Sequence, residues 1–148
     1  MPMGKDIGFL PGNLEEKMAP WLAPIVDNLE FLTNNDTKVI EKWKEDGLIE
    51  VEALTYIRGR SISNAFIIVD EAQNLTMHEV KTILTRVGEG TKIVLTGDIE
   101  QIDNVYTDET SNGLTHVVEK FKDQEFAGHV TLRKGERSRV ATAAAIIL

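Results

Sequence analysis

The hydrophobic positions in the first third of the chain follow helical and then strand-like spacing. Apolar residues recur at steps of three and four from Leu14 to Leu32, which predicts a helix that starts or bends near the two prolines inside this stretch. Residues 37–44 predict a second, shorter helix that a glycine ends. Residues 48–53 (LIEVEA) alternate between apolar and polar positions, as a strand does.

The middle of the chain alternates continuous apolar runs with helical spacing. Residues 65–69 and 91–96 are apolar runs rich in branched residues, typical of strands that are covered on both faces. Between them, Thr76 and Glu79 form a capping box, which predicts the start of a helix. The remaining predicted elements are a helix over residues 114–121, a short strand over residues 129–132 and a final helix over residues 137–148.

This alternation of strands and helices indicates the fold class. Strands that alternate with helices of this length imply parallel strands joined by right-handed crossovers. We therefore predict an α/β fold, a parallel sheet with helices on both faces. The length of 148 residues suits one ordinary domain or a piece of a larger one.

Composition narrows the function classes without selecting one. No segment approaches the roughly 20 apolar residues needed to cross a bilayer, and the first residues lack the pattern of a secretion signal, so we expect a cytoplasmic protein that does not enter a membrane. The chain has no cysteine, which excludes disulfides, thiolate catalysis and zinc–thiolate sites. The formal net charge of −8 does not favour binding of nucleic acid through bulk charge, although nucleic acid can still bind locally.

Polar side chains suited to nucleotide chemistry follow both central strands. The first strand runs into Asp70-Glu71-Ala72-Gln73, and the second into Gly97-Asp98-Ile99-Glu100-Gln101. The carboxyl ends of parallel strands form the edge where such sheets bind ligands. A hydrophobic strand that ends in Asp-Glu is typical of the acidic half of a phosphate-loop NTPase, in which Asp70 would hold Mg²⁺ and Glu71 would orient and deprotonate the attacking water.

The two glutamines beside these carboxylates also suit a nucleotide site, but a simpler interpretation of the carboxylates stays open. Gln73 and Gln101 can both donate and accept hydrogen bonds, so they are suited to sensing a phosphate oxygen and to relaying its loss. The simpler interpretation is that Asp70 and Glu71 only cap the helix that follows. A second strand with a Gly-Asp-x-x-Gln end shifts the balance towards a nucleotide site.

The order of four segments resembles the PhoH family, particularly its members with an N-terminal PIN nuclease domain. These segments are GFLPGNLEEKM, YIRGRSISNAFIIVDEAQNLT, LTRVGEGTKIVLTGDIEQID and LRKGERS, and together the match covers essentially the whole chain. The two strand-end motifs are similar to the second and third motifs of superfamily-one helicase-like ATPases. The resemblance implies a RecA-like P-loop NTPase core that uses ATP and Mg²⁺ and that, in the PIN-fused members, is linked to RNA unwinding and cleavage.

The resemblance also implies roles for individual residues. By position, Asp70 would coordinate Mg²⁺, Glu71 would be the hydrolytic base, and Gln73 and Gln101 would report on the terminal phosphate, with Gly97 and Asp98 on the same nucleotide-binding edge. In LRKGERS, Arg137 is the candidate arginine finger. It would act on its own nucleotide or on that of a neighbour in a ring, and we expect a homo-oligomer.

Two further arginines match a family signature. Arg58 and Arg60 flank a glycine before the first central strand. They are either solvated loop residues or contacts to phosphate, RNA or another subunit, for which planar arginine is well suited.

One departure from the family is large. Family members carry a phosphate loop of the form G-x-x-x-x-G-K-[ST] upstream of GFLPG, and this sequence has none. We therefore expect residues 1–148 to be the downstream part of an ATPase domain, truncated on its N-terminal side, which alone would bind ATP weakly or not at all. Two alternatives stay open, namely a non-hydrolysing oligomeric interaction module and a DNA-directed helicase-like ATPase.

Overall fold

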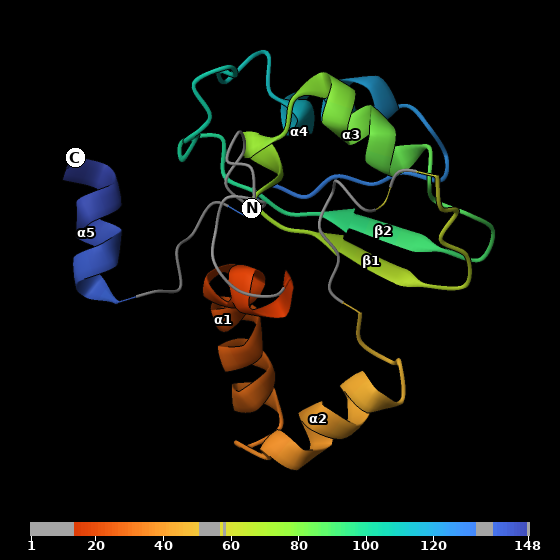
Figure 1. The fold of residues 1–148 in the computed structure, drawn as a ribbon. Helices are drawn as coiled ribbons and strands as arrows, with labels where there is room; N and C mark the ends of the chain where they lie inside the picture. Colours follow the sequence, from red (N-terminus) through yellow and green to blue (C-terminus); the bar gives the residue numbers. More distant parts are fainter. Residues whose placement is uncertain (1–13, 51–56, 58, 133–137, 148) are drawn as a thin grey trace.

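The elements of the chain are those of a small α/β structure (Figure 1). The computed structural model describes residues 14–50, 57, 59–132 and 138–147. In chain order, the elements are α1 (Leu14–Leu32), α2 (Thr37–Glu45), β1 (Phe66–Val69), the short 3₁₀ helix η3 (Ala72–Asn74), α3 (Met77–Leu84), β2 (Lys92–Leu95), α4 (Gly113–Phe121) and α5 (Arg139–Ile147).

The two strands pair in parallel, as the alternation of elements predicted. The register runs from Phe66 opposite Lys92 to Val69 opposite Leu95, and α3 lies in the connection between the strands. Ile62 forms an isolated parallel bridge with Val87 ahead of the strands. Both strands therefore end at the same edge of the sheet.

The core lies between one face of the sheet and the helices α3 and α4 (Figure 1). Its buried residues are Ala72, Leu75, Val80 and Ile83, with Val69, Ile93, Leu95, Leu114 and Val117 packed against them. Side chains alternate between the two faces of a strand, so the face opposite this core carries Phe66 and Ile68, which are 63% and 66% exposed. The described residues thus cover one face of β1, whereas the sequence predicted cover on both faces.

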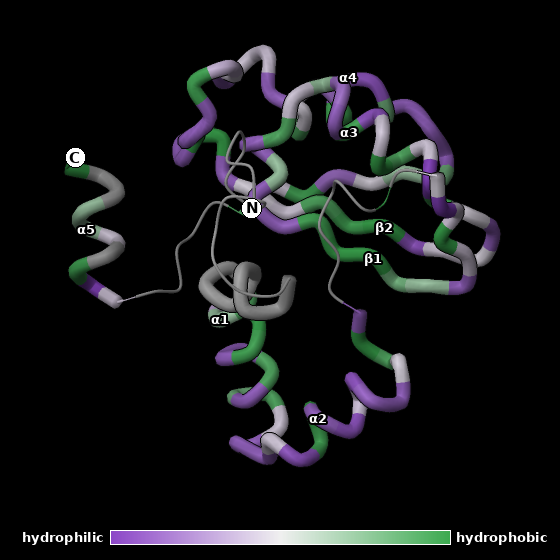
Figure 2. The backbone as a smooth tube through the Cα atoms, in the orientation of Figure 1, coloured by the Kyte–Doolittle hydropathy of each residue, from purple (hydrophilic) through white to green (hydrophobic). Residues whose placement is uncertain are grey.

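The sheet and its connections differ clearly in hydropathy. Figure 2 shows β1 and β2 as hydrophobic segments and the segments that leave the sheet as largely hydrophilic.

The capping box of α3 is confirmed, because Glu79 N donates to Thr76 Oγ1 (3.3 Å) and Thr76 N donates to a Glu79 carboxylate oxygen (2.9 Å). At α4, Asn112 Oδ1 accepts a hydrogen bond from Thr115 N (2.9 Å). These caps fix where both core helices begin.

Three predictions about elements need correction. Helix α1 runs through Pro20 and Pro24 without a break, so the predicted new start near these prolines is wrong. Residues 129–132 do not form a strand: Val130 and Leu132 are 80% and 88% exposed, and no described strand pairs with them. Residues 48–50 are not in a strand either, and residues 51–53 lie outside the described part of the chain.

Helix α5 begins at Arg139 rather than at the predicted residue 137, and residues 137 and 148 lie outside the described part. Among the helices that the structure describes, none combines the length and apolar character that a membrane crossing requires.

Candidate functional site

The structure brings the two polar segments together at one edge of the sheet. Thr96 N donates to Val69 O (2.9 Å), and Ala72 N donates to Thr96 O (2.9 Å), so the chain leaving β1 is tied to the chain leaving β2. The parallel register carries Asp70 and Thr96 to adjacent positions. The candidate site is therefore built from residues 70–74 and 96–104.

Asp70 is exposed, and its carboxylate is held through one of its two oxygens. Asp70 Oδ1 accepts hydrogen bonds from Thr96 Oγ1 (2.7 Å) and from Glu71 N (3.0 Å). Within the described residues, no hydrogen bond reaches Oδ2. The carboxylate thus has a fixed side towards β2 and a second oxygen available to a ligand.

Glu71 adopts a backbone conformation that residues with side chains rarely take. Its φ of 54° and ψ of 38° lie in the left-handed region, which costs a residue other than glycine on the order of 1–3 kcal/mol. Its side chain makes no capping hydrogen bond to η3, and α3 is capped by Thr76 instead. The interpretation of Asp70 and Glu71 as helix caps is therefore wrong.

Gln73 joins the two segments. Its side chain is fully buried, with 0% exposure. Gln73 Nε2 donates to Glu71 Oε2 (2.6 Å) and to the backbone oxygen of Gln101 (3.0 Å), while Gln73 Oε1 accepts from Asp98 N (3.2 Å). One amide thus contacts the carboxylate of the first segment and the backbone of the second.

The side chain of Gln101 bonds to Asp98, whereas its backbone oxygen bonds to the buried amide of Gln73. Gln101 Nε2 donates to Asp98 Oδ2 (2.7 Å), and both residues are exposed. Asp98 Oδ1 in turn accepts from Glu100 N (3.0 Å). Asp98 therefore shapes the turn that presents the Gln101 side chain to solvent.

Gly97 leaves the space that Gln73 fills. A Cβ atom on Gly97 would collide with Gln73 Oε1, and it would also lie 2.9 Å from Leu114 Cδ2 and 3.1 Å from Gln73 N. The first two contacts are closer than real Cβ atoms show and the third is tighter than most, and all three are to the buried Gln73 or the core-packed Leu114. The φ of Gly97 is not in the left-handed region, so backbone conformation does not require glycine here. Close packing does.

We expect Gly97→Ala to lower the free energy of unfolding by about 1–3 kcal/mol, the usual cost of overpacking a filled site. Thermal unfolding of the variant and the parent measures the effect. Gly128→Ala is the matched control, because a Cβ there meets nothing within 4 Å. Equal unfolding midpoints for Gly97→Ala and Gly128→Ala would contradict this account of the packing.

Sequence reasoning missed Thr96, Asn74 and Asn104. Asn74 Oδ1 accepts from Asp103 N (2.8 Å) and Asn104 N (3.2 Å), and Asn104 Nδ2 donates to Asn74 O (2.8 Å). Asn104 is buried, with 9% exposure. The only signal in the sequence was that Asn74 and Thr96 stand beside the two motifs, since pairing between distant asparagines leaves no local pattern.

The segment after Asn104 contains a carboxyl group, that of Asp108, whose pKa is strongly lowered. The hydroxyl of Thr110, followed by the backbone amides of Thr110 and Ser111, lowers the pKa of Asp108 to about 2. Asp108 is fully exposed, and the hydrogen bonds themselves form a turn just before α4. The shift thus belongs to the turn and not to the candidate site.

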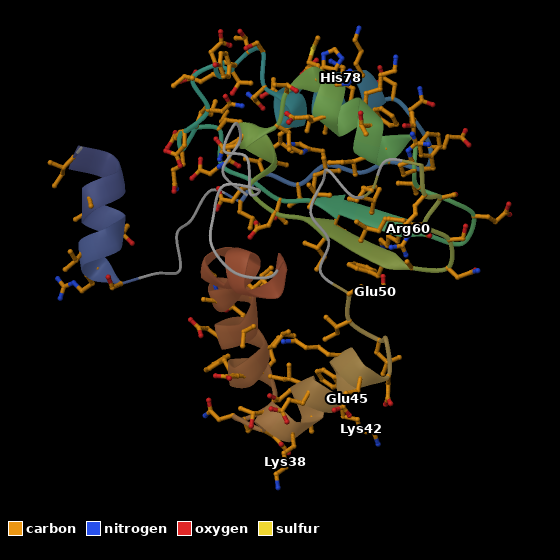
Figure 3. The ribbon with its side chains drawn as sticks, viewed as in Figure 1. Lys38, Lys42, Glu45, Glu50, Arg60 and His78 are labelled. Atoms are coloured by element: carbon orange, nitrogen blue, oxygen red, sulfur yellow. The ribbon has the colours of Figure 1, made fainter. Side chains whose placement is uncertain are left out.

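Of the three arginines that the sequence singled out, the structure describes Arg60, and Arg60 does not lie at this edge. Arg60 precedes the Ile62 bridge, so it enters the sheet from the amino end of β1, opposite to Asp70. Arg60 contacts Glu50 (Nη2 to Oε2, 3.5 Å), and both side chains are more than half exposed (Figure 3), so the ion pair contributes little to stability. Arg58 and Arg137 lie outside the described residues.

The donor set fits a magnesium ion that a nucleotide shares. In the part of the chain that the structure describes, no group of three or more His, Cys, Asp or Glu residues could hold a metal by itself. Mg²⁺ in nucleotide sites typically takes one or two carboxylates and completes its shell with phosphate oxygens and water. The available oxygen of Asp70 meets this requirement, while the 148 residues contain no glycine-rich lysine loop to hold the phosphates.

Comparison with known proteins gives a consistent result. The sequence model of the family described as PhoH-like protein matches residues 1–148. The chain is 61% identical over 150 residues to "Protein PhoH2" of Bacillus subtilis (strain 168), covering 100% of this chain and 34% of that protein. It is 43% identical over 138 residues to "Protein PhoH2" of Mycolicibacterium smegmatis, covering 93% of this chain and 31% of that protein.

A third relative has a less specific name. The chain is 46% identical over 100 residues to a "PhoH-like protein" of Bacillus subtilis (strain 168), covering 68% of this chain and 31% of that protein. The chain therefore spans about a third of the length of these curated relatives.

Proposed function

We propose, since the chain belongs to the PhoH family, that it supplies the acidic half of an ATPase site in a RecA-like P-loop NTPase core. In the complete gene product this site would hydrolyse ATP and couple hydrolysis to the unwinding or processing of RNA in the cytoplasm. The relatives' names state neither activity, so the proposal rests on the geometry of the sheet edge and on the motif resemblance.

The observation that carries the proposal is the buried amide of Gln73. It contacts the Glu71 carboxylate (2.6 Å), the Gln101 carbonyl (3.0 Å) and the Asp98 amide (3.2 Å). A buried polar side chain that joins two exposed acidic segments is not explained by apolar packing alone. It is instead suited to holding a carboxylate in place and to linking its position to the neighbouring segment.

The proposed roles follow from these contacts. Asp70 would offer Oδ2 to Mg²⁺, and Mg²⁺, when bound, would neutralise charge on the phosphates of the nucleotide. Glu71 orients the attacking water and accepts its proton, and Gln73 relays changes at Glu71 to residues 98–101. Gln101, at the exposed end of that segment, senses the terminal phosphate.

The proposal also assigns roles to three arginines, of which the structure describes Arg60. We assign Arg137 the role of arginine finger, acting within its own chain or on a neighbour in a homo-oligomer. Arg58 and Arg60 are proposed as contacts to phosphate, RNA or another subunit. For Arg60, its place at the amino end of β1 favours RNA or a subunit over the nucleotide at the opposite edge.

The test is hydrolysis of ATP by the complete gene product, measured with Mg²⁺ alone, with added RNA and with added DNA. We expect Mg²⁺-dependent turnover that RNA stimulates more than DNA. ATP binding without turnover would favour the non-hydrolysing interaction module. Stimulation by DNA alone would identify a DNA-directed ATPase instead.

A further inference from the structure

Thr96, the first residue after β2, makes three hydrogen bonds to the end of β1 and to the turn that follows it. Its backbone N donates to Val69 O (2.9 Å), and its backbone O accepts from Ala72 N (2.9 Å). Its hydroxyl Oγ1 donates to Asp70 Oδ1 (2.7 Å). Any residue other than proline could make the two backbone bonds, but the third requires a hydroxyl or a similar donor.

The hydrogen bond from the Thr96 hydroxyl fixes the orientation of the Asp70 carboxylate and contributes little to the stability of the fold. Thr96 and Asp70 are both exposed, so water can replace the bond at small cost to stability. Hydrogen bonds to an ionised carboxylate are nevertheless short and strong, and this one acts together with the Glu71 amide (3.0 Å) on the same oxygen. Two donors on Oδ1 restrict rotation of the carboxylate and leave Oδ2 available.

We propose that Thr96 is a positioning residue for Asp70, and that it fixes the Asp70 carboxylate so that Oδ2 is the oxygen offered to the Mg²⁺ of a magnesium–nucleotide complex. This inference rests on the proposed function, because it names a device of the same site. Partners that orient a metal ligand typically change metal affinity by about 10- to 100-fold when they are removed. Thr96 would act through Asp70 and is assigned no contact to the nucleotide itself.

The experiment compares Thr96→Val, which removes the hydroxyl at nearly constant shape, with Thr96→Ser, which keeps it. In the complete gene product, binding of ATP is measured by calorimetry over a range of Mg²⁺ concentrations and again in EDTA. We expect Thr96→Val to raise the half-saturating Mg²⁺ concentration by about 10-fold or more. ATP binding in EDTA should stay as in the parent, and Thr96→Ser should restore the parent Mg²⁺ dependence.

One control variant and a second readout separate the orientation of the carboxylate from an effect on folding. Thr85→Val removes an exposed hydroxyl that bonds only to the Thr82 backbone oxygen (3.1 Å) at the end of α3, and it should leave the Mg²⁺ dependence unchanged. Electron paramagnetic resonance of Mn²⁺ added with ATP gives a second readout of the metal that does not require turnover. If Thr96→Val unfolds, Thr96→Ala carries the same comparison with Thr96→Ser.

Three other outcomes would overturn the proposed role of Thr96. Equal Mg²⁺ dependence in Thr96→Val and the parent overturns the inference and leaves the proposed function standing. The same follows if Thr96→Ser is as weak as Thr96→Val, since the methyl group would then be the active feature. If the parent binds ATP with no dependence on Mg²⁺, both the inference and the proposed function are wrong.

Discussion

Replacing Glu71 by glutamine is expected to lower the rate of ATP hydrolysis in the complete gene product by about 10²- to 10⁴-fold, the usual contribution of a general base. The amide keeps the shape of the carboxylate and an oxygen that can accept the hydrogen bond from Gln73 Nε2 (2.6 Å in the parent). The site should therefore stay assembled while the proton acceptor is lost. ATP binding and hydrolysis, measured on the same sample, separate the two effects.

The matched control for this variant is Glu89→Gln. Glu89 is an exposed glutamate in the turn between α3 and β2, at the end of the sheet opposite to Glu71. The Glu89→Gln variant loses the same charge at a position away from the candidate site, so its rate of ATP hydrolysis should equal that of the parent. Parent-like turnover in Glu71→Gln would remove Glu71 from the role of base.

Replacing Gln73 by leucine is expected to lower the free energy of unfolding by about 2–3 kcal/mol, because three part-buried hydrogen bonds are lost and each contributes on the order of 0.5–1.5 kcal/mol. Leucine is similar in size to glutamine, so the cavity term is small. The Asp98 amide (3.2 Å in the parent) and the Gln101 carbonyl (3.0 Å) lose their partner, and the Glu71 carboxylate is released. ATP turnover should fall as well, because both acidic segments lose their common contact.

Urea unfolding and ATP turnover test the Gln73 prediction together. Gln124→Leu is the matched control, because Gln124 is exposed after α4 and only its backbone forms hydrogen bonds. Gln73→Glu provides a second comparison: it keeps the shape but sets a carboxylate against Glu71, so it should be at least as destabilising. A Gln73→Leu variant that unfolds like Gln124→Leu would refute the linking role.

Local patterns predicted the elements whose ends are fixed locally. The capping box of Thr76 and Glu79 predicted the start of α3 because both of its bonds join residues three apart in the chain. The apolar runs predicted β1 and β2, and the alternation of elements predicted that the strands are parallel. From these two facts, the meeting of the Asp70 and Gln101 segments at one edge also followed.

The features that sequence could not predict depend on contacts between distant residues. The run His129 to Leu132 has strand-like residues, yet a strand also needs a hydrogen-bonding neighbour, and among the described residues it has none. The burial of Gln73 requires the space that Gly97 leaves 24 positions later in the chain. The left-handed backbone of Glu71 is equally invisible, because nothing in its residue type favours that region.

The anchoring of Asn104 has a practical consequence for engineering this protein. Residues 96–112 join β2 to α4 without a regular element, and a surface connection of this kind is normally chosen for inserting a purification tag or a fluorescent domain. Here Asn104 is tied to Asn74 (2.8 Å), Tyr106 N to Asn104 Oδ1 (3.0 Å), and Asp108 to Thr110 (2.7 Å). An inserted sequence would break one of these ties, so the connection after α4, around the unobstructed Gly128, is the better place for such a fusion.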